Sequence, residues 1–173
     1  GHAYVGHVLG KTLTKVTIIP STSGMGGATF FEGQEAVKLN TFRDLTNELS
    51  ILYAGRAAEE LLAEQKDEIT TGAVNDIERA TVLIRDMVTK YGAAQVYGDG
   101  VPLALDATAD KQYISDWMTE LARKAYAKAA EILEKDWEKV IEVADKLYVD
   151  ETLSQKEFLE VVKAVSIADT CEN

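Results

Sequence analysis

The feature that most restricts the fold is a long run of apolar residues at helical spacing in the second half of the chain. They recur every three or four positions with one wider gap: Ile114, Trp117, Leu121, Ala125, Ala129, Ile132, Val140, Val143 and Leu147. A single helix over this whole segment would be longer than the average helix of a globular protein. We therefore expect that it either packs along a neighbouring helix or breaks near Asp136. The pattern predicts a mainly α-helical protein.

Two other helix starts, at Thr41 and Ser154, carry a capping box, in which a hydroxyl and a carboxylate three residues apart bond each other's backbone. Thr41 with Asp44 precedes apolar residues at helical spacing that continue into "GRAAEELLAE". Ser154 with Glu157 precedes "FLEVVKAV". We expect a long helix after the first box and a short closing helix after the second.

A further amphipathic helix follows the breaking stretch "QKDEITTG" and ends at Gly92. One face carries the apolar residues Ile77, Ala80, Ile84, Met87 or Val88, and Tyr91. Residues 93–110 contain glycines and Pro102, which predict that this segment is a loop.

The first 33 residues have a different character. Ala3, Val5 and Leu9 suggest the last turns of a helix. "KVTIIP" and "ATFF" are rich in β-branched or aromatic residues and are separated by the glycine-rich "STSGMGG". We predict a small β-sheet or hairpin here. With 173 residues, the sequence indicates a single domain made of segments 1–33, 41–92, 93–110 and 111–165.

Charge and hydropathy exclude two classes of partner. The formal net charge of −11 would repel a phosphate backbone, so we expect no nucleic acid. No apolar run approaches the roughly 18 to 20 residues that cross a bilayer, so we expect no membrane segment in this chain.

Few residues offer catalytic chemistry, since the P-loop and G-x-S-x-G patterns are absent. His2 and His7 are five residues apart, so on a helix they diverge by about 140° and cannot chelate one metal together. The segment "TTGAVNDIERAT" begins a helix near Asp76. From the residues alone, the simplest interpretation is that Asn75 and Asp76 cap this helix and complement its dipole.

Several segments together resemble the zinc peptidase domain of the FtsH family of membrane-anchored, ATP-dependent proteases. They are "GHAYVG", "KVTIIP", "LSILYAGRAAEEL", "TTGAVNDIERAT" and "DMVTKYG", followed by "ARKAYAKAAEILEKDWEKVIEVADKLYVDETLSQKEFLEVV". They occur in the family's order and cover nearly the whole chain. The resemblance implies a helical metallopeptidase domain that degrades unfolded or membrane polypeptides.

The family's metal site uses H-E-x-x-H on a helix and an aspartate in T-T-G-A-x-N-D. By position, the resemblance makes His2 the second histidine and Asp76 the third ligand of a Zn²⁺ ion. Where the family has "HEAGH", this chain has only "GH". No catalytic residue is therefore present, because the general-base glutamate would precede residue 1, and we expect this chain alone to be inactive. Either the sequence is cut inside the motif, in which case Gly1 can be a tag remnant, or the protein is a non-catalytic relative acting as a ring subunit or peptide-binding module.

Other expectations rest on the same resemblance. Gly24 to Phe31 would contribute an edge strand that holds an extended polypeptide, with Gly26, Gly27, Ala28 and Thr29 in contact with it. The family forms a hexameric ring, so a homo-oligomer is implied. ATP would act only through an ATPase module that this chain does not contain. The family is membrane-anchored, with this domain in the cytoplasm, mitochondrion or chloroplast. Glu59 and Glu60 are interpreted as helix charges that pair with neighbours such as Arg56.

Overall fold

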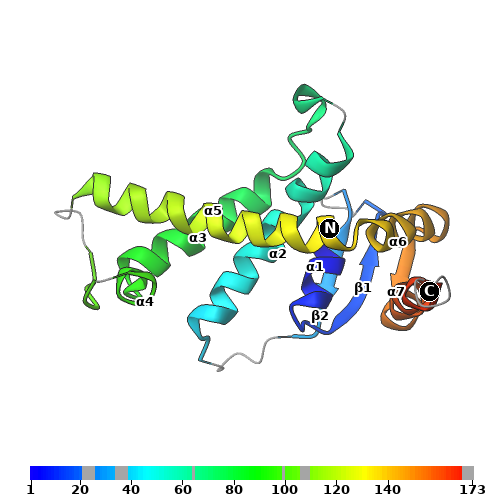
Figure 1. Cartoon of the computed structure of the whole chain (residues 1–173), viewed down its shortest axis with the longest axis horizontal. Coiled ribbons are helices and arrows are strands. Elements are labelled where there is room, and N and C mark those ends of the chain that lie inside the picture. The colour runs from blue at the N-terminus through cyan, green and yellow to red at the C-terminus, as the bar shows by residue number, and fades with distance from the viewer. Residues whose placement is uncertain (21–25, 34–38, 64, 99, 106–109, 169–173) are drawn as a thin grey trace. The chain divides into compact units, whose positions relative to one another are not determined.

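A computed structural model describes residues 1–20, 26–33, 39–63, 65–98, 100–105 and 110–168 (Figure 1). The chain divides into two compact units, one formed by residues 1–36 and 132–173 and the other by residues 37–131. The predicted fold class, mainly α-helical with a small sheet near the N-terminus, is confirmed. The division into segments of a single domain stays a prediction.

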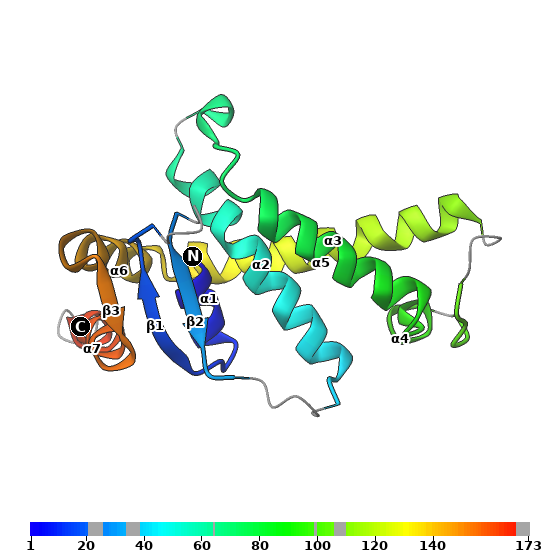
Figure 2. The same ribbon diagram turned by 180° about the vertical axis from the view of Figure 1, so that it is seen from behind.

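The sheet of the first unit contains three antiparallel strands, in the order β2-β1-β3 (Figure 2). Strand β1 spans Leu13–Thr17, β2 spans Ala28–Phe31 and β3 spans Thr152–Ser154. The strand predicted at "KVTIIP" therefore begins earlier and stops sooner than expected. At its end Thr17 pairs with Ala28 of β2 and with Thr152 of β3.

Strand β3 is missing from the sequence-based prediction. Three residues are too few to show an alternating pattern, so nothing distinguishes "TLS" from a turn. In the structure, Leu153 lies opposite Val16 and both are buried. A side chain from a distant part of the sequence thus completes the buried face of the hairpin.

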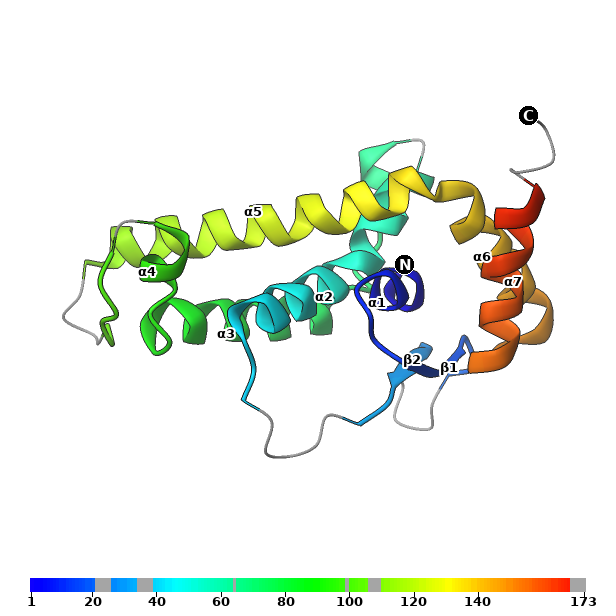
Figure 3. The same ribbon diagram turned by 60° about the horizontal axis from the view of Figure 1, so that its bottom comes forward.

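Three helices cover this unit: α1 (His2–Val8), α6 (Trp137–Asp150) and α7 (Gln155–Ala168). Helices α6 and α7 lie side by side (Figure 3). The capping box predicted for α7 is confirmed, because the Ser154 amide donates to Glu157 Oε2 at 2.8 Å and the Glu157 amide donates back to Ser154 Oγ at 3.4 Å. The fully buried side chains of the first unit include Val5, Leu133, Leu153 and Phe158.

The long helical pattern breaks where the sequence suggested. Helix α5 spans Lys111–Lys135, and α6 begins at Trp137. Asp136 lies between them with φ −120° and ψ 31°, outside the helical region. The polar residue in the gap of the apolar pattern therefore marks the change of helix direction.

The second unit packs α2 (Phe42–Leu62), α3 (Val74–Thr89), α4 (Ala93–Tyr97) and most of α5 around one core. This core contains Leu49, Leu52, Ala80, Ile84, Met87, Val88, Ala93, Leu121 and Ala125. Helix α2 begins with the predicted capping box, because the Thr41 amide donates to Asp44 Oδ2 at 2.9 Å and the Asp44 amide donates to Thr41 Oγ1 at 3.2 Å.

Two predictions for this unit are wrong in detail. Residues 93–110 are not all loop, because α4 lies within them and its Ala93 and Ala94 are buried. Tyr91 is 50% exposed and follows the end of α3, so it does not belong to the buried face. Gly92 takes φ +74°, which turns the chain from α3 into α4. In the part of the chain that the structure describes, no helix combines the length and apolar character needed to cross a bilayer.

Candidate functional site

Helix α1 places the two histidines in different surroundings. His2 is half-buried at the first position of α1, whose next four residues are buried. The His7 ring packs edge-on against Phe158 of α7, with ring centroids 5.5 Å apart. His7 is therefore a packing residue between α1 and α7.

A buried hydrogen bond holds α1 to the junction of α5 and α6. The Tyr4 hydroxyl donates to the Asp136 carboxylate, and Lys139 Nζ donates to Asp136 Oδ1 at 3.0 Å. Burial first, and then Asp136, raise the pKa of the Tyr4 hydroxyl. Burial alone would raise the pKa of Asp136, but the bonds from Lys139 and Tyr4 outweigh it and the pKa is lowered. The sequence offers no signal for this contact, because its partners are more than 130 residues apart.

Tyr4→Phe is expected to reduce the free energy of unfolding by about 1.5 kcal/mol at pH 7, because Asp136 loses a donor to its charged form. Since the folded pKa of Asp136 is lowered, this stabilisation exists above the ordinary aspartate value of about 3.9 and disappears as pH falls through the folded value. Urea unfolding of both proteins between pH 7 and pH 3 measures the difference. A difference that is the same at every pH would contradict the assignment.

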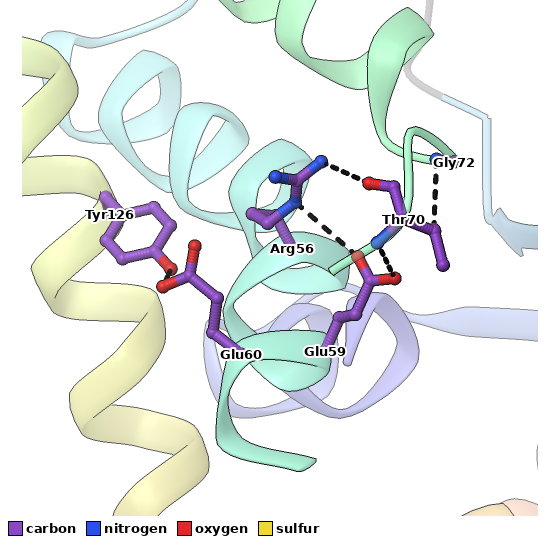
Figure 4. Close-up of polar contacts among 6 residues, drawn as sticks. All are labelled: Arg56, Glu59, Glu60, Thr70, Gly72 and Tyr126. Atoms are coloured by element: carbon purple, nitrogen blue, oxygen red, sulfur yellow. Dashed lines mark hydrogen bonds and ion pairs between the residues drawn. The ribbon is translucent and has the colours of Figure 1, made fainter. Parts of the chain in front are cut away.

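The chain between α2 and α3 is tied back to α2, as Figure 4 shows. After the short 3₁₀ helix Lys66–Glu68, the Thr70 amide donates to Glu59 Oε1 at 2.8 Å, and Arg56 Nη2 donates to the Thr70 carbonyl at 2.8 Å. The Gly72 amide donates to Thr70 Oγ1 at 3.1 Å. The "TTGA" stretch is thus a turn that is held by hydrogen bonds and leads into α3.

Asp76 lies in the first turn of α3. The N-cap of α3 is Ala73, which makes no side-chain capping bond, and both Asn75 and Asp76 lie inside the helix. The prediction that these two residues cap the helix is therefore wrong. Asp76 still lies at the positive end of the helix dipole, which favours a carboxylate there.

Asp76 forms an ion pair with Arg79, whose Nη1 lies 3.8 Å from Asp76 Oδ1. Arg79 Nη2 lies at the same distance from Glu48 Oε1 on α2, and the Arg79 side chain is 65% exposed. Ion pairs this exposed contribute roughly 0–1 kcal/mol.

The donor chemistry of His2 and Asp76 fits zinc, which prefers imidazole nitrogen and carboxylate oxygen. His2 belongs to the first unit and Asp76 to the second. Among the residues that the structure describes, no three His, Cys, Asp or Glu side chains gather into a metal-binding group. A catalytic zinc usually has three protein ligands.

Strand β2 lies at the edge of its sheet and, in the described part of the chain, pairs only with β1. Ala28 and Thr29 belong to it, and Gly26 and Gly27 precede it, whereas Gly24 and Met25 lie outside the described residues. Gly27 has φ +134°, and a Cβ there would lie 2.8 Å from the Thr17 carbonyl oxygen. The hairpin itself therefore requires glycine at this position.

The two glutamates near the end of α2 have different partners. Glu59 Oε2 lies 3.5 Å from Arg56 Nε, which confirms the predicted ion pair, whereas Glu60 accepts a hydrogen bond from the Tyr126 hydroxyl of α5. The sequence indicated the i,i+3 charge pair but not the second role of Glu59 as an acceptor for Thr70. That role depends on where the following loop returns.

Residues 1–161 match the family model described as peptidase family M41. The chain is 33% identical to the ATP-dependent zinc metalloprotease FtsH of Clostridium perfringens, over 94% of the chain and 24% of that protein. It is 34% identical to the FtsH of Lancefieldella parvula, over 94% of the chain and 27% of that protein. The chain spans about a quarter of the length of these curated relatives. A family model that covers nearly the whole chain and relatives at this identity show that the chain belongs to peptidase family M41.

Proposed function

We propose that the chain is the peptidase domain of an ATP-dependent zinc endopeptidase of the FtsH type. Family membership supports this proposal, and so do the names of the relatives. In it, His2 and Asp76 are zinc ligands, and the first histidine and the general-base glutamate would precede residue 1. Substrates would be unfolded or membrane polypeptides.

The observation that carries the proposal is the setting of Asp76. Its carboxylate lies in the first turn of α3, at the positive end of the helix dipole, and its side chain is 26% exposed. The chemistry that bound zinc supplies is Lewis-acid activation of water and polarisation of a peptide carbonyl. For this chain's own residues, the role of Asp76 is to offer a partly desolvated carboxylate to that ion.

The edge of β2 supports the binding of an extended polypeptide. An unpaired strand edge can hold a peptide through main-chain hydrogen bonds, which makes binding largely indifferent to substrate sequence. In this proposal Gly26, Gly27, Ala28 and Thr29 contact the substrate, and Gly27 also shapes the hairpin. The relatives' names further suggest coupling to ATP, which an ATPase module outside this chain would supply, and the family suggests a hexameric ring.

The alternative is a non-catalytic M41 fold that serves as a ring subunit or a peptide-binding module. The natural sequence immediately before Ala3 discriminates between the two. H-E-x-x-H there would exclude the alternative.

A direct test uses an extended chain, in which His-Glu-Ala is placed before Gly1 so that the sequence begins H-E-A-G-H. We expect the extended chain to bind about one zinc per polypeptide. The chain without the extension should bind zinc far more weakly, because three protein ligands hold a catalytic zinc. Metal analysis after dialysis and zinc titration measure both. Failure of the extended chain to bind zinc would overturn the proposal.

A further inference from the structure

Thr70 has each of its polar groups engaged, although it lies in an exposed loop. Its amide donates to Glu59 Oε1 at 2.8 Å, and its carbonyl accepts from Arg56 Nη2 at 2.8 Å. Its side chain also bonds Glu59, while its Oγ1 accepts from the Gly72 amide at 3.1 Å. Both the amide and the carbonyl of this loop residue are thus hydrogen-bonded to side chains of α2.

The two gripping side chains support each other. Arg56 and Glu59 are one helical turn apart on α2, and Arg56 Nε lies 3.5 Å from Glu59 Oε2 (Figure 4). Their side chains are only 23% and 26% exposed, so solvent screens this pair less than a surface pair. Bonds from Thr70, side chain first and then amide, and more weakly the charge of Arg56, lower the pKa of Glu59. Glu59 is therefore held in its charged, accepting form.

The grip fixes the start of α3. After Thr70 the Gly72 amide turns back to Thr70 Oγ1, the Val74 amide donates to the Thr71 carbonyl at 3.2 Å, and α3 begins at Val74. Asp76 follows two residues later. Only this short turn separates the gripped residue from the carboxylate, so the direction in which α3 leaves the loop depends on Thr70.

We propose that Arg56 and Glu59 form a backbone clamp on Thr70 that positions Asp76 for zinc, so that both are positioning residues of the metal site. The inference rests on the proposed function for its metal but not for its geometry. Neither clamp residue touches zinc in this proposal. Their effect on the metal passes through the rigidity of the loop, as it does for outer-shell groups that orient metal ligands.

Glu60 provides a matched control. It is the same residue type at the next position of α2, and it also accepts a hydrogen bond from another element. Its donor is the Tyr126 hydroxyl of α5, however, and not Thr70. Removing Glu60 should weaken helix packing without releasing Thr70.

The first measurement is amide hydrogen exchange of Thr70 by NMR in the chain without the extension. Because Thr70 is exposed, the bond to Glu59 is its main protection, and Glu59→Ala should raise its exchange rate by about tenfold or more. Glu59→Gln keeps an acceptor oxygen and should retain part of the protection, even if the alanine variant folds poorly. Glu60→Ala should leave the Thr70 rate unchanged. Equal Thr70 rates in the Glu59→Ala protein and the parent would overturn the clamp.

The second measurement is zinc affinity in the extended chain. Glu59→Ala should weaken zinc binding by about tenfold, as changes behind a metal ligand do, with partial rescue by Glu59→Gln and no change in Glu60→Ala. Faster Thr70 exchange with unchanged zinc affinity would overturn the positioning role. If the extended chain binds no zinc before any substitution, the proposed function fails, and the exchange result still decides the clamp.

Discussion

Asp76→Ala in the extended chain is expected to abolish stoichiometric zinc binding, from about one zinc per polypeptide to nearly none. A catalytic zinc site has three protein ligands. Without its carboxylate, this site would retain only two imidazole ligands, which are too few to hold zinc tightly. The replaced side chain lies in the first turn of α3, after the N-cap Ala73, and alanine has the highest helix propensity. The helix should therefore persist, and its circular dichroism should match that of the parent.

Glu78→Ala is the matched control for this change. Glu78 lies on the same helix, carries the same charge and is exposed. The control should therefore retain zinc. In the same way His2→Gln should lose the metal, while His7→Gln, which removes the ring packed on Phe158, should keep it. Full zinc occupancy in the Asp76→Ala protein would rule out Asp76 as a ligand.

Gly6→Ala is expected to reduce the free energy of unfolding of the chain by about 1–3 kcal/mol, as overpacking does. Gly6 lies in α1, and a Cβ there would approach the Phe31 ring of β2 to 2.2 Å. Without that ring, alanine should instead stabilise the helix by roughly 0.5–1 kcal/mol over glycine. Urea unfolding measures both.

The decisive comparison is therefore a double-mutant cycle with Phe31. In a Phe31→Ala protein, Gly6→Ala should become neutral or stabilising, so its effect changes sign. Phe30 provides the control, because it is 45% exposed and has Lys15 Nζ 4.9 Å from its ring centroid. In a Phe30→Ala protein, Gly6→Ala should remain destabilising. The same sign in all three backgrounds would show that the Phe31 ring does not limit residue 6.

Local patterns in the sequence predicted the features that arise within one element. Both capping boxes, the break of the long helix at Asp136 and the pair of strands near the N-terminus are confirmed. Each depends on residues a few positions apart, whose geometry is set by the helix or strand repeat. The resemblance to the FtsH family is likewise confirmed, because ordered motifs over nearly the whole chain are visible without coordinates.

Contacts between distant residues could be found only in the tertiary structure. Strand β3 forms because it pairs with β1, Tyr4 holds α1 through Asp136, and Thr70 is clamped because the loop returns to the helix it left. None of these has a periodic signal, since each depends on where the chain places a residue in space. The sequence alone therefore determined the family, most of the helices and the candidate ligands, whereas the tertiary structure decided which side chains hold those ligands' helices in place.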